Sequence, residues 1–125
     1  MTRSTAKLLH TGDEQRRRWN IIAASRARDA RYVPQLLARL DSDETQANKR
    51  HIVRALGNIG DMRAEPALLD LLQTAHAPIL GDVILALGQL KSRRAAPFAK
   101  LLLEHDDAWV RQNAKCMQKQ MDKFQ

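Results

Sequence analysis

The chain has few of the residues on which metal sites, disulfide scaffolds and secreted domains depend. It has one cysteine, Cys116, so an intrachain disulfide is excluded. Its four histidines are His10, His51, His76 and His105, and none stands at ligand spacing from another histidine or from the cysteine. Because zinc sites need such clusters, we expect no bound metal.

Long apolar runs are also missing. No run approaches the roughly 20 residues that cross a bilayer. Leu8 and Leu9 are the only large apolar pair in the first 13 residues, too short for a signal-peptide core. Together with the single cysteine, these absences favour a cytoplasmic protein without a membrane span.

Motifs for catalysis are missing too. The glycine pairs are placed to end helices rather than to cradle phosphate. Asp41, Asp43 and Glu44 fall in an expected turn and are interpreted as helix caps. We therefore expect no enzyme activity, no catalytic residue and no cofactor.

What remains favours one all-helical domain over residues 1–125. Aromatic residues make up 4% of the chain and hydrophobic residues 44%. Leu and Ala carry most of that apolar content, and both favour helix over strand. The net charge of +7 would attract anionic partners such as nucleic acid, anionic lipid or an acidic protein face.

The sequence repeats itself after 31 residues. Positions 55–72 share eight identities in 18 positions with positions 86–103, among them the Ala-Leu-Gly motif, an Arg-Ala pair and a proline. A shift of 32 adds an earlier copy, in which Asp29 and Pro34 fall on Asp61 and Pro66. Repeats of this length indicate a solenoid.

Each copy is interpreted as two helices. The first helix opens at a proline and carries a leucine stripe, and the second ends at a glycine or an equivalent position. The expected helices are 4–10, 14–28, 33–40, 44–59, 64–74, 78–90, 94–104 and 107–123. They form about four stacked antiparallel hairpins, with residues 1–12 frayed or an abbreviated first helix.

The stretch RALGNIGDMRAEPALL, residues 54–69, resembles the short bacterial and archaeal HEAT repeat, as in the HEAT-like repeats of phycobilin lyases. Residues 107–114, DAWVRQNA, match the start of its second helix. The resemblance covers most of residues 14–120 and implies an α-solenoid. It implies little about function, because such repeats serve many unrelated tasks.

The resemblance also implies a ladder of ion pairs between repeats. The candidates here are Asp29 and Asp61 with Lys49 and Arg111. Leu80 and Ser92 replace the arginine and the aspartate of the third copy. We therefore expect the ladder to be incomplete there and hydrophobic packing to replace it.

In HEAT repeats the second helices usually line a concave face, where we expect the binding site. Helical wheels place Ile52, Ala55, Leu56 and Ile59 inward. They place Arg50, His51, Arg54 and Asn58 outward, followed by Gly81, Asp82, Leu85 and Gln89 and then by Gln112, Asn113, Cys116 and Gln120. The predicted partner-binding residues are Arg18, Arg26, Arg50, His51, Arg54, Leu85, Gln89, Gln112 and Lys119.

Several residues allow two interpretations. The basic face is either a docking surface or a solvated face. Arg16, Arg17 and Arg18 with Trp19 could grip a single strand, but a tryptophan that plugs the end of the core is preferred. Trp109 is likewise expected to cap the core, and Cys116 to be an inert thiol.

The leading hypothesis is a non-catalytic scaffold that binds an acidic or mixed-charge protein on its concave face. The first alternative is a nucleic-acid-associated protein that uses the same face on phosphates. The second is a homo-oligomer formed through the open ends of the solenoid.

Overall fold

A computed structural model of the chain describes residues 9–124, which contain α-helices, short 3-10 helices and no β-strand. The α-helices are α2 (Glu14–Ala27), α3 (Val33–Leu40), α4 (Gln46–Ile59), α5 (Glu65–Thr74), α6 (Ile79–Gln89), α7 (Ala96–Leu102) and α8 (Ala108–Phe124). These helices confirm the all-α prediction, with bounds within a few residues of those expected. The expected helix at 4–10 lies mostly outside the described residues, and His10 is in a turn.

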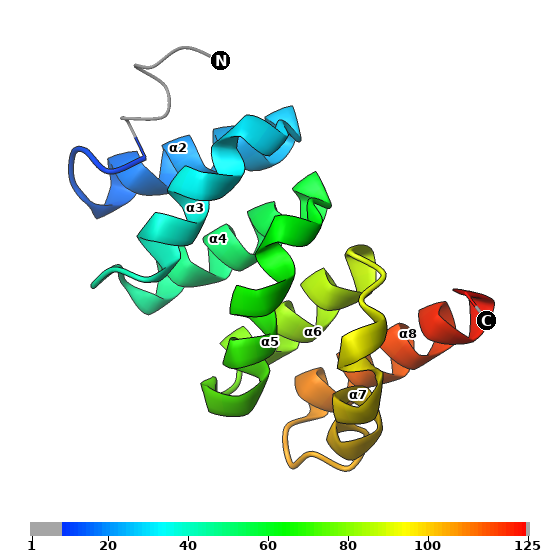
Figure 1. Ribbon diagram of the computed structural model, residues 1–125. Helices are drawn as coiled ribbons and strands as arrows, with labels where there is room; N and C mark the ends of the chain where they lie inside the picture. The colour runs from blue at the N-terminus through cyan, green and yellow to red at the C-terminus, as the bar shows by residue number, and fades with distance from the viewer. Residues whose placement is uncertain (1–8, 125) are drawn as a thin grey trace.

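The helices form three hairpins, α3–α4, α5–α6 and α7–α8, preceded by α2, which is equivalent to a second helix (Figure 1). A 3-10 turn opens each hairpin: η1 (Ala30–Tyr32), η2 (Met62–Ala64) and η3 (Arg93–Ala95). The second helices α2, α4, α6 and α8 pack in series, and each first helix packs on its own partner. The repeat seen in the sequence is therefore a structural repeat.

Capping residues explain where the helices begin. Asp13 accepts a hydrogen bond from the Arg16 amide at 2.9 Å at the start of α2, and Thr45 accepts one from Asn48 at 3.2 Å at the start of α4. Each of α3, α5 and α7 has a proline in its first turn, where a missing N–H costs nothing.

Three equivalent positions end or follow the second helices in the left-handed conformation. Gly60 has φ 75°, whereas Arg28 has φ 50° and Lys91 has φ 59°. Only glycine adopts this conformation without steric cost, so the repeat has kept its geometry where it has lost its glycine.

The second helices approach one another closely because small residues lie between them. A Cβ atom at Gly57 would lie 2.9 Å from the Ala86 Cα and 3.0 Å from the Ala86 Cβ. The first helices contact one another less extensively than the second helices do. This difference in packing is expected when the second helices form the inner layer of a curved stack.

The predicted ladder of ion pairs is wrong. Asp29 pairs with Arg31 at 2.7 Å and Asp61 with Arg63 at 2.9 Å, so each aspartate caps its own turn. Arg111 donates to backbone carbonyls at residues 105 and 106. A carbonyl does link neighbouring turns, because Arg63 Nη2 donates to the Ala30 oxygen at 2.8 Å.

The third copy has no charged side chain at the two positions where the predicted ladder would need one. Leu80 is buried in the core, and the buried hydroxyl of Ser92 has no hydrogen-bond partner among the described residues. The 3-10 turn at Arg93–Ala95 has no side-chain cap. The adjacent repeats are nevertheless joined by a polar contact here, because Arg94 lies 3.7 Å from the Glu65 carboxylate of α5.

No helix in the described part of the chain is long and apolar enough to cross a membrane. The same residues contain no cluster of three or more His, Cys, Asp or Glu side chains that would hold a metal.

Candidate interaction face

We call the solvent side of α2, α4, α6 and α8 the inner face. Shifts of 32 and then 31 residues align four rows of equivalent positions across it. The rows are Gln15, Ala47, Pro78 and Trp109; Trp19, His51, Asp82 and Asn113; Ile22, Arg54, Leu85 and Cys116; and Arg26, Asn58, Gln89 and Gln120. Three hydrogen bonds between neighbouring second helices have this spacing, because they join side chains that are 31 to 33 residues apart.

Asp82 organises the centre of the face. Its carboxylate is fully buried and accepts from Arg50 Nε at 2.7 Å and from Arg54 Nε at 3.1 Å. The wheel placed Asp82 and Gly81 in solvent, and that prediction is wrong for both. The sequence did contain a signal for this burial, because Asp82 is a lone carboxylate in an apolar helix and follows Arg50 by 32 residues.

The Asp82 clamp changes the meaning of the predicted basic stripe. Arg50 and Arg54 are on the inner face, as expected, but one buried negative charge offsets part of their two positive charges. A buried carboxylate that loses its partners is costly, so both arginines stabilise the α4–α6 contact. Arg54 still exposes 45% of its side chain and retains donors that face solvent.

His51 lies in a cationic environment. Partial burial lowers its pKa, and the nearby Arg54, Arg18 and Arg50 lower the pKa further. The imidazole is therefore neutral near neutral pH, and it offers a partner an uncharged polar edge.

Amide side chains form a hydrogen-bonded row. Asn58 Nδ2 donates to Ser25 Oγ at 2.8 Å, and Gln89 Nε2 donates to Asn58 Oδ1 at 3.1 Å. Asn113 Nδ2 donates to the Gly81 carbonyl at 3.1 Å, so this residue is buried rather than outward as predicted. Much of the polar capacity of the face is used between its own helices.

A shallow hollow of about 250 Å³ lies over α4 and α6, and Trp109 of α8 borders it. Its lining residues are Arg54, Asn58, Asp82, Leu85, Gln89 and Trp109. The Trp109 ring covers Gly81, where any side chain would overlap it, and the ring remains 42% exposed. Trp109 therefore lines the inner face instead of capping the core as predicted. Leu85 is half-buried beside it.

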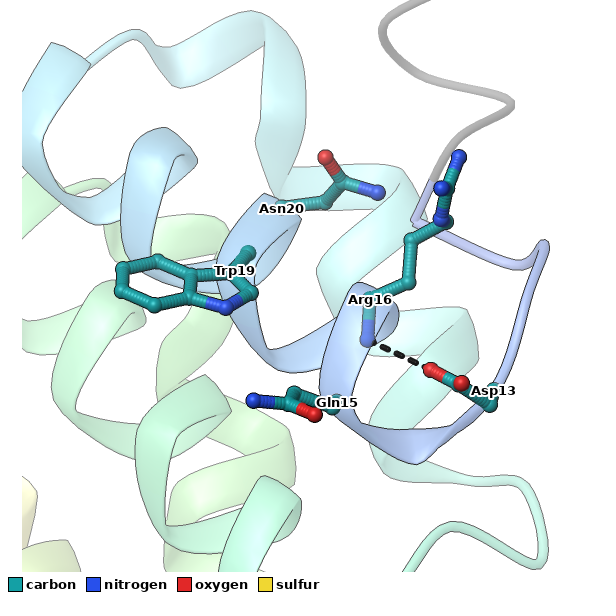
Figure 2. A pocket seen from close by; sticks show the side chains of 5 residues that line it. All are labelled: Asp13, Gln15, Arg16, Trp19 and Asn20. Atoms are coloured by element: carbon teal, nitrogen blue, oxygen red, sulfur yellow. Dashed lines mark hydrogen bonds between the residues drawn. The ribbon is translucent and has the colours of Figure 1, made fainter.

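Trp19 occupies the other end of the face. It is 63% exposed, so the prediction that it plugs the core is wrong. It borders a hollow of about 450 Å³ with Asp13, Gln15, Arg16 and Asn20. Figure 2 shows the Trp19 ring and the Arg16 guanidinium extending in different directions from α2.

The three consecutive arginines do not form one free cluster. Arg17 pairs with Glu44 at 2.8 Å, and Arg18 donates to Asn48 at 2.8 Å and to Glu14 at 2.7 Å. Arg18 does lie beside His51, which feels its charge. This leaves Arg16 as the exposed member of the group.

The remaining predicted residues lie toward the ends. Arg26 continues the amide row on α2, and Gln112 and Lys119 are exposed on α8. Cys116 is exposed in the row of Leu85. The structure thus brings Arg18, Arg50 and Arg54 together around His51, and Leu85 and Gln89 line one hollow with Arg54. Arg26 lies in the row of Gln89, whereas Gln112 and Lys119 lie outside the four rows.

Comparisons with known proteins agree with this architecture. HEAT repeats match residues 33–117. The Bilin biosynthesis protein PecE of Nostoc sp. (strain PCC 7120 / SAG 25.82 / UTEX 2576) is 37% identical over 73 residues, which are 58% of this chain and 29% of that relative. The chain thus aligns with less than a third of that relative's length. The sequence repeat, its structure and the match over residues 33–117 together show that the chain belongs to the HEAT-repeat family.

Proposed function

We propose that the chain is a non-catalytic interaction module whose inner face holds an acidic, amphipathic helix of a partner protein. One observation carries the proposal: both tryptophans of the chain are exposed on the face that also carries the exposed arginines Arg26 and Arg54. Such aromatic and arginine side chains are the residue types that dominate binding energy at protein interfaces.

The apolar part of the proposed contact has three anchor points. Leu85 of α6 and Trp109 of α8 border one hollow, and Trp19 of α2 borders the other. A water-exposed indole gains free energy when a partner covers it, at about 25 cal/mol per Å² of apolar surface. Among the described side chains, the two other large exposed apolar ones, Met62 and Leu101, lie off this face.

The charge of the face favours an acidic partner. The chain carries a net +7. Asp82 is the acidic residue of the four inner rows, and it is already held by Arg50 and Arg54. Arg26 and the exposed donors of Arg54 therefore meet the partner's carboxylates without a competing acidic side chain in the rows.

The paired amides favour a helical partner over an extended one. An extended segment needs hydrogen-bond partners for its backbone, whereas a helix satisfies its own. Asn58 and Gln89 already bond to each other, and Asn113 bonds to Gly81. With interhelical distances of 8–10 Å, three steps from α2 to α8 span about 24–30 Å. A helix of roughly 16–20 residues would cover that length.

The test is affinity capture from a lysate of the protein's own cells, with and without nuclease. Trp19→Ala/Trp109→Ala is compared with Met62→Ala/Leu101→Ala, which removes the two exposed apolar side chains outside the face. We expect the first variant to lose a nuclease-resistant partner and the second to keep it. Retention of that partner by both variants would refute the proposed face, provided that circular dichroism shows both to be folded.

A second pair of variants tests the charges. Arg16→Glu/Arg26→Glu changes exposed cations of α2, one beside the Trp19 hollow and one in the fourth row, and Arg93→Glu/Lys100→Glu makes the same net change on the other side. Arg50 and Arg54 are unsuitable, because their reversal would strand the buried Asp82 and confound folding with binding. We expect only the first pair to weaken capture.

Nucleic acid is the alternative ligand for the same basic face, favoured by the net charge. It predicts recovery that nuclease abolishes and a steep fall of affinity with salt, because phosphate neutralisation releases counterions. Recovery of this kind would replace the protein-binding proposal.

A second candidate function comes from the relative, a protein named for bilin biosynthesis. A role on an open-chain tetrapyrrole predicts a shift of the pigment's visible absorption when purified protein is added. An unchanged spectrum over a titration would remove this candidate. No step of a reaction is assigned, because the inner rows contain no acid–base or nucleophilic constellation.

A further inference from the structure

A separate hollow opens at the edge of the stack, between the turns of the second and third copies. Its volume is about 620 Å³, within the ordinary range for small-molecule sites. The first turns of α4 and α6 and the ends of α3 and α5 surround it. The lining residues are Leu40, Gln46, Ala47, Lys49, Arg50, Leu71, Thr74, Ala75, His76, Ala77, Pro78 and Ile79.

The lining is apolar over most of its extent. Seven of its twelve residues have aliphatic side chains or are proline, and Leu40, Leu71 and Ile79 supply the largest ones. Leu40 and Leu71 are only partly buried, so their side chains still border the opening. An unbranched hydrocarbon chain that covered them would gain about 0.8 kcal/mol per buried methylene.

One edge of the hollow is cationic. Lys49 forms no ion pair and no side-chain hydrogen bond with any residue in the described range 9–124. Its neighbour Arg50 is held by Asp82 at 2.7 Å. None of the described lining residues carries a carboxylate, so the lysine charge has no counterpart inside the hollow.

We infer that this hollow binds a small monocarboxylate with an unbranched apolar tail, of the medium-chain fatty-acid class. The ammonium group of Lys49 takes the carboxylate, and the hydrocarbon lies along Leu40, Leu71 and Ile79. The hollow adjoins the proposed partner face, because it shares Ala47 and Pro78 with the first row and Arg50 with the Asp82 clamp. Its charged group is separate, since Lys49 belongs to none of the four rows and takes no part in that clamp.

The test is a calorimetric titration with octanoate, supported by amide chemical shifts. Octan-1-ol replaces the carboxylate by a neutral group, and a tripeptide ending in leucine presents a carboxylate on a protein terminus. Lys49→Gln removes the charge, and Lys100→Gln is its control, an exposed lysine away from the hollow. Ala47→Trp fills the hollow from an exposed position and leaves the core untouched.

We expect octanoate to shift the amides that line the hollow, and its affinity to rise about fourfold for each added methylene. Lys49→Gln should weaken octanoate about fivefold and leave octan-1-ol unchanged, as for a solvent-exposed ion pair. Ala47→Trp should abolish binding of both, and Lys100→Gln should have no effect.

Three results would overturn the inference. Equal affinity of wild type and Lys49→Gln for octanoate would remove the carboxylate site. Shifts spread over the inner face, or binding that survives Ala47→Trp, would place the ligand elsewhere. Tighter binding of the tripeptide than of octanoate would reassign the hollow to a protein C-terminus.

Discussion

Among single residues, Glu44 shows best how burial changes what a side chain does. Its carboxylate has no exposed surface, and it accepts from Arg17 at 2.8 Å and from Arg39 at 3.2 Å. Burial alone would raise its pKa, but the bonds from Arg17, the Thr45 amide and Asn48 lower the pKa to about 2. In the sequence it was only one of three acidic residues in a turn.

We predict that Glu44→Gln lowers the free energy of unfolding near neutral pH by about 3 kcal/mol. The pKa of Glu44 is lower in the folded than in the unfolded chain. The stabilisation is therefore fully present above pH 4.5 and is lost as the pH falls toward about 2. Urea unfolding at several pH values should show wild type and variant converging in acid. Asp43→Asn, at an exposed neighbour, should match the stability of the wild type at every pH. A difference in stability between wild type and Glu44→Gln that persisted in acid would contradict this account.

At the level of elements, the sequence repeat predicts the helical hairpins better than it predicts the side-chain contacts between neighbouring hairpins. Leucine stripes, first-turn prolines and the Ala-Leu-Gly motif depend on local geometry, which a single sequence records. Which side chain reaches the next repeat depends on the angle between helices. The wheel therefore placed Arg54 and Leu85 correctly but missed Asp82 and Asn113, which neighbouring helices cover.

The predictions for Trp19 and Trp109 were wrong for a different reason. An aromatic residue near an end of a helical stack usually covers the core, and that general tendency decided the prediction. Aligning Trp19 with His51 and Trp109 with Ala47 through the repeat would have placed both on the inner face.

The helix ends give a matched pair of predictions. Arg28→Gly should stabilise the protein by about 1 kcal/mol, because Arg28 ends α2 with φ 50°. Gly60→Ala should destabilise it by a similar amount, and only through backbone strain, since nothing lies within 4 Å of a Cβ at Gly60. Thermal unfolding of the two variants should shift in opposite directions. If both variants shifted the unfolding temperature in the same direction, the left-handed backbone at these positions would not be the cause of the change in stability.

The glycines between second helices give another pair. Gly57→Ala would press a methyl group against the Ala86 backbone, so we expect a loss of about 1–3 kcal/mol. At Gly88 the new methyl would meet the movable amide of Gln120, with the Met117 Cα 3.9 Å away. Gly88→Ala should therefore be neutral, or stabilising by up to about 1 kcal/mol. Chemical unfolding measures both, and equal losses would disprove the close approach of α4 to α6.

At the scale of the whole molecule, the two end helices differ from those inside the stack. The position of Gly57 and Gly88 is taken in α8 by Lys119, so a further helix could not approach as closely there. Helices α2 and α8 each carry four basic residues and one acidic residue. Both ends would repel a second copy at low salt.

We therefore predict a monomer, in place of the end-to-end oligomer that the sequence also allowed. Sedimentation velocity at low ionic strength should give one monomeric species across a wide concentration range. Lys119→Gly removes the obstructing side chain and part of the charge, and it should increase any association that exists. The prediction would be contradicted if the wild type formed dimers and Lys119→Glu strengthened them. Such dimers would use an end contact built on other residues.

The central claim is that the inner face binds a protein, and the single cysteine allows a direct test. Cys116 is exposed in the row of Leu85, so a thiol-reactive photo-crosslinker can be attached there without mutation. The matched control is Cys116→Ser/Gln73→Cys, which moves the only thiol to an exposed position on α5. On illumination in lysate, the account predicts a discrete protein adduct from Cys116 that Trp109→Ala abolishes, and no such adduct from position 73. The same adducts from both positions, or none from Cys116, would contradict it.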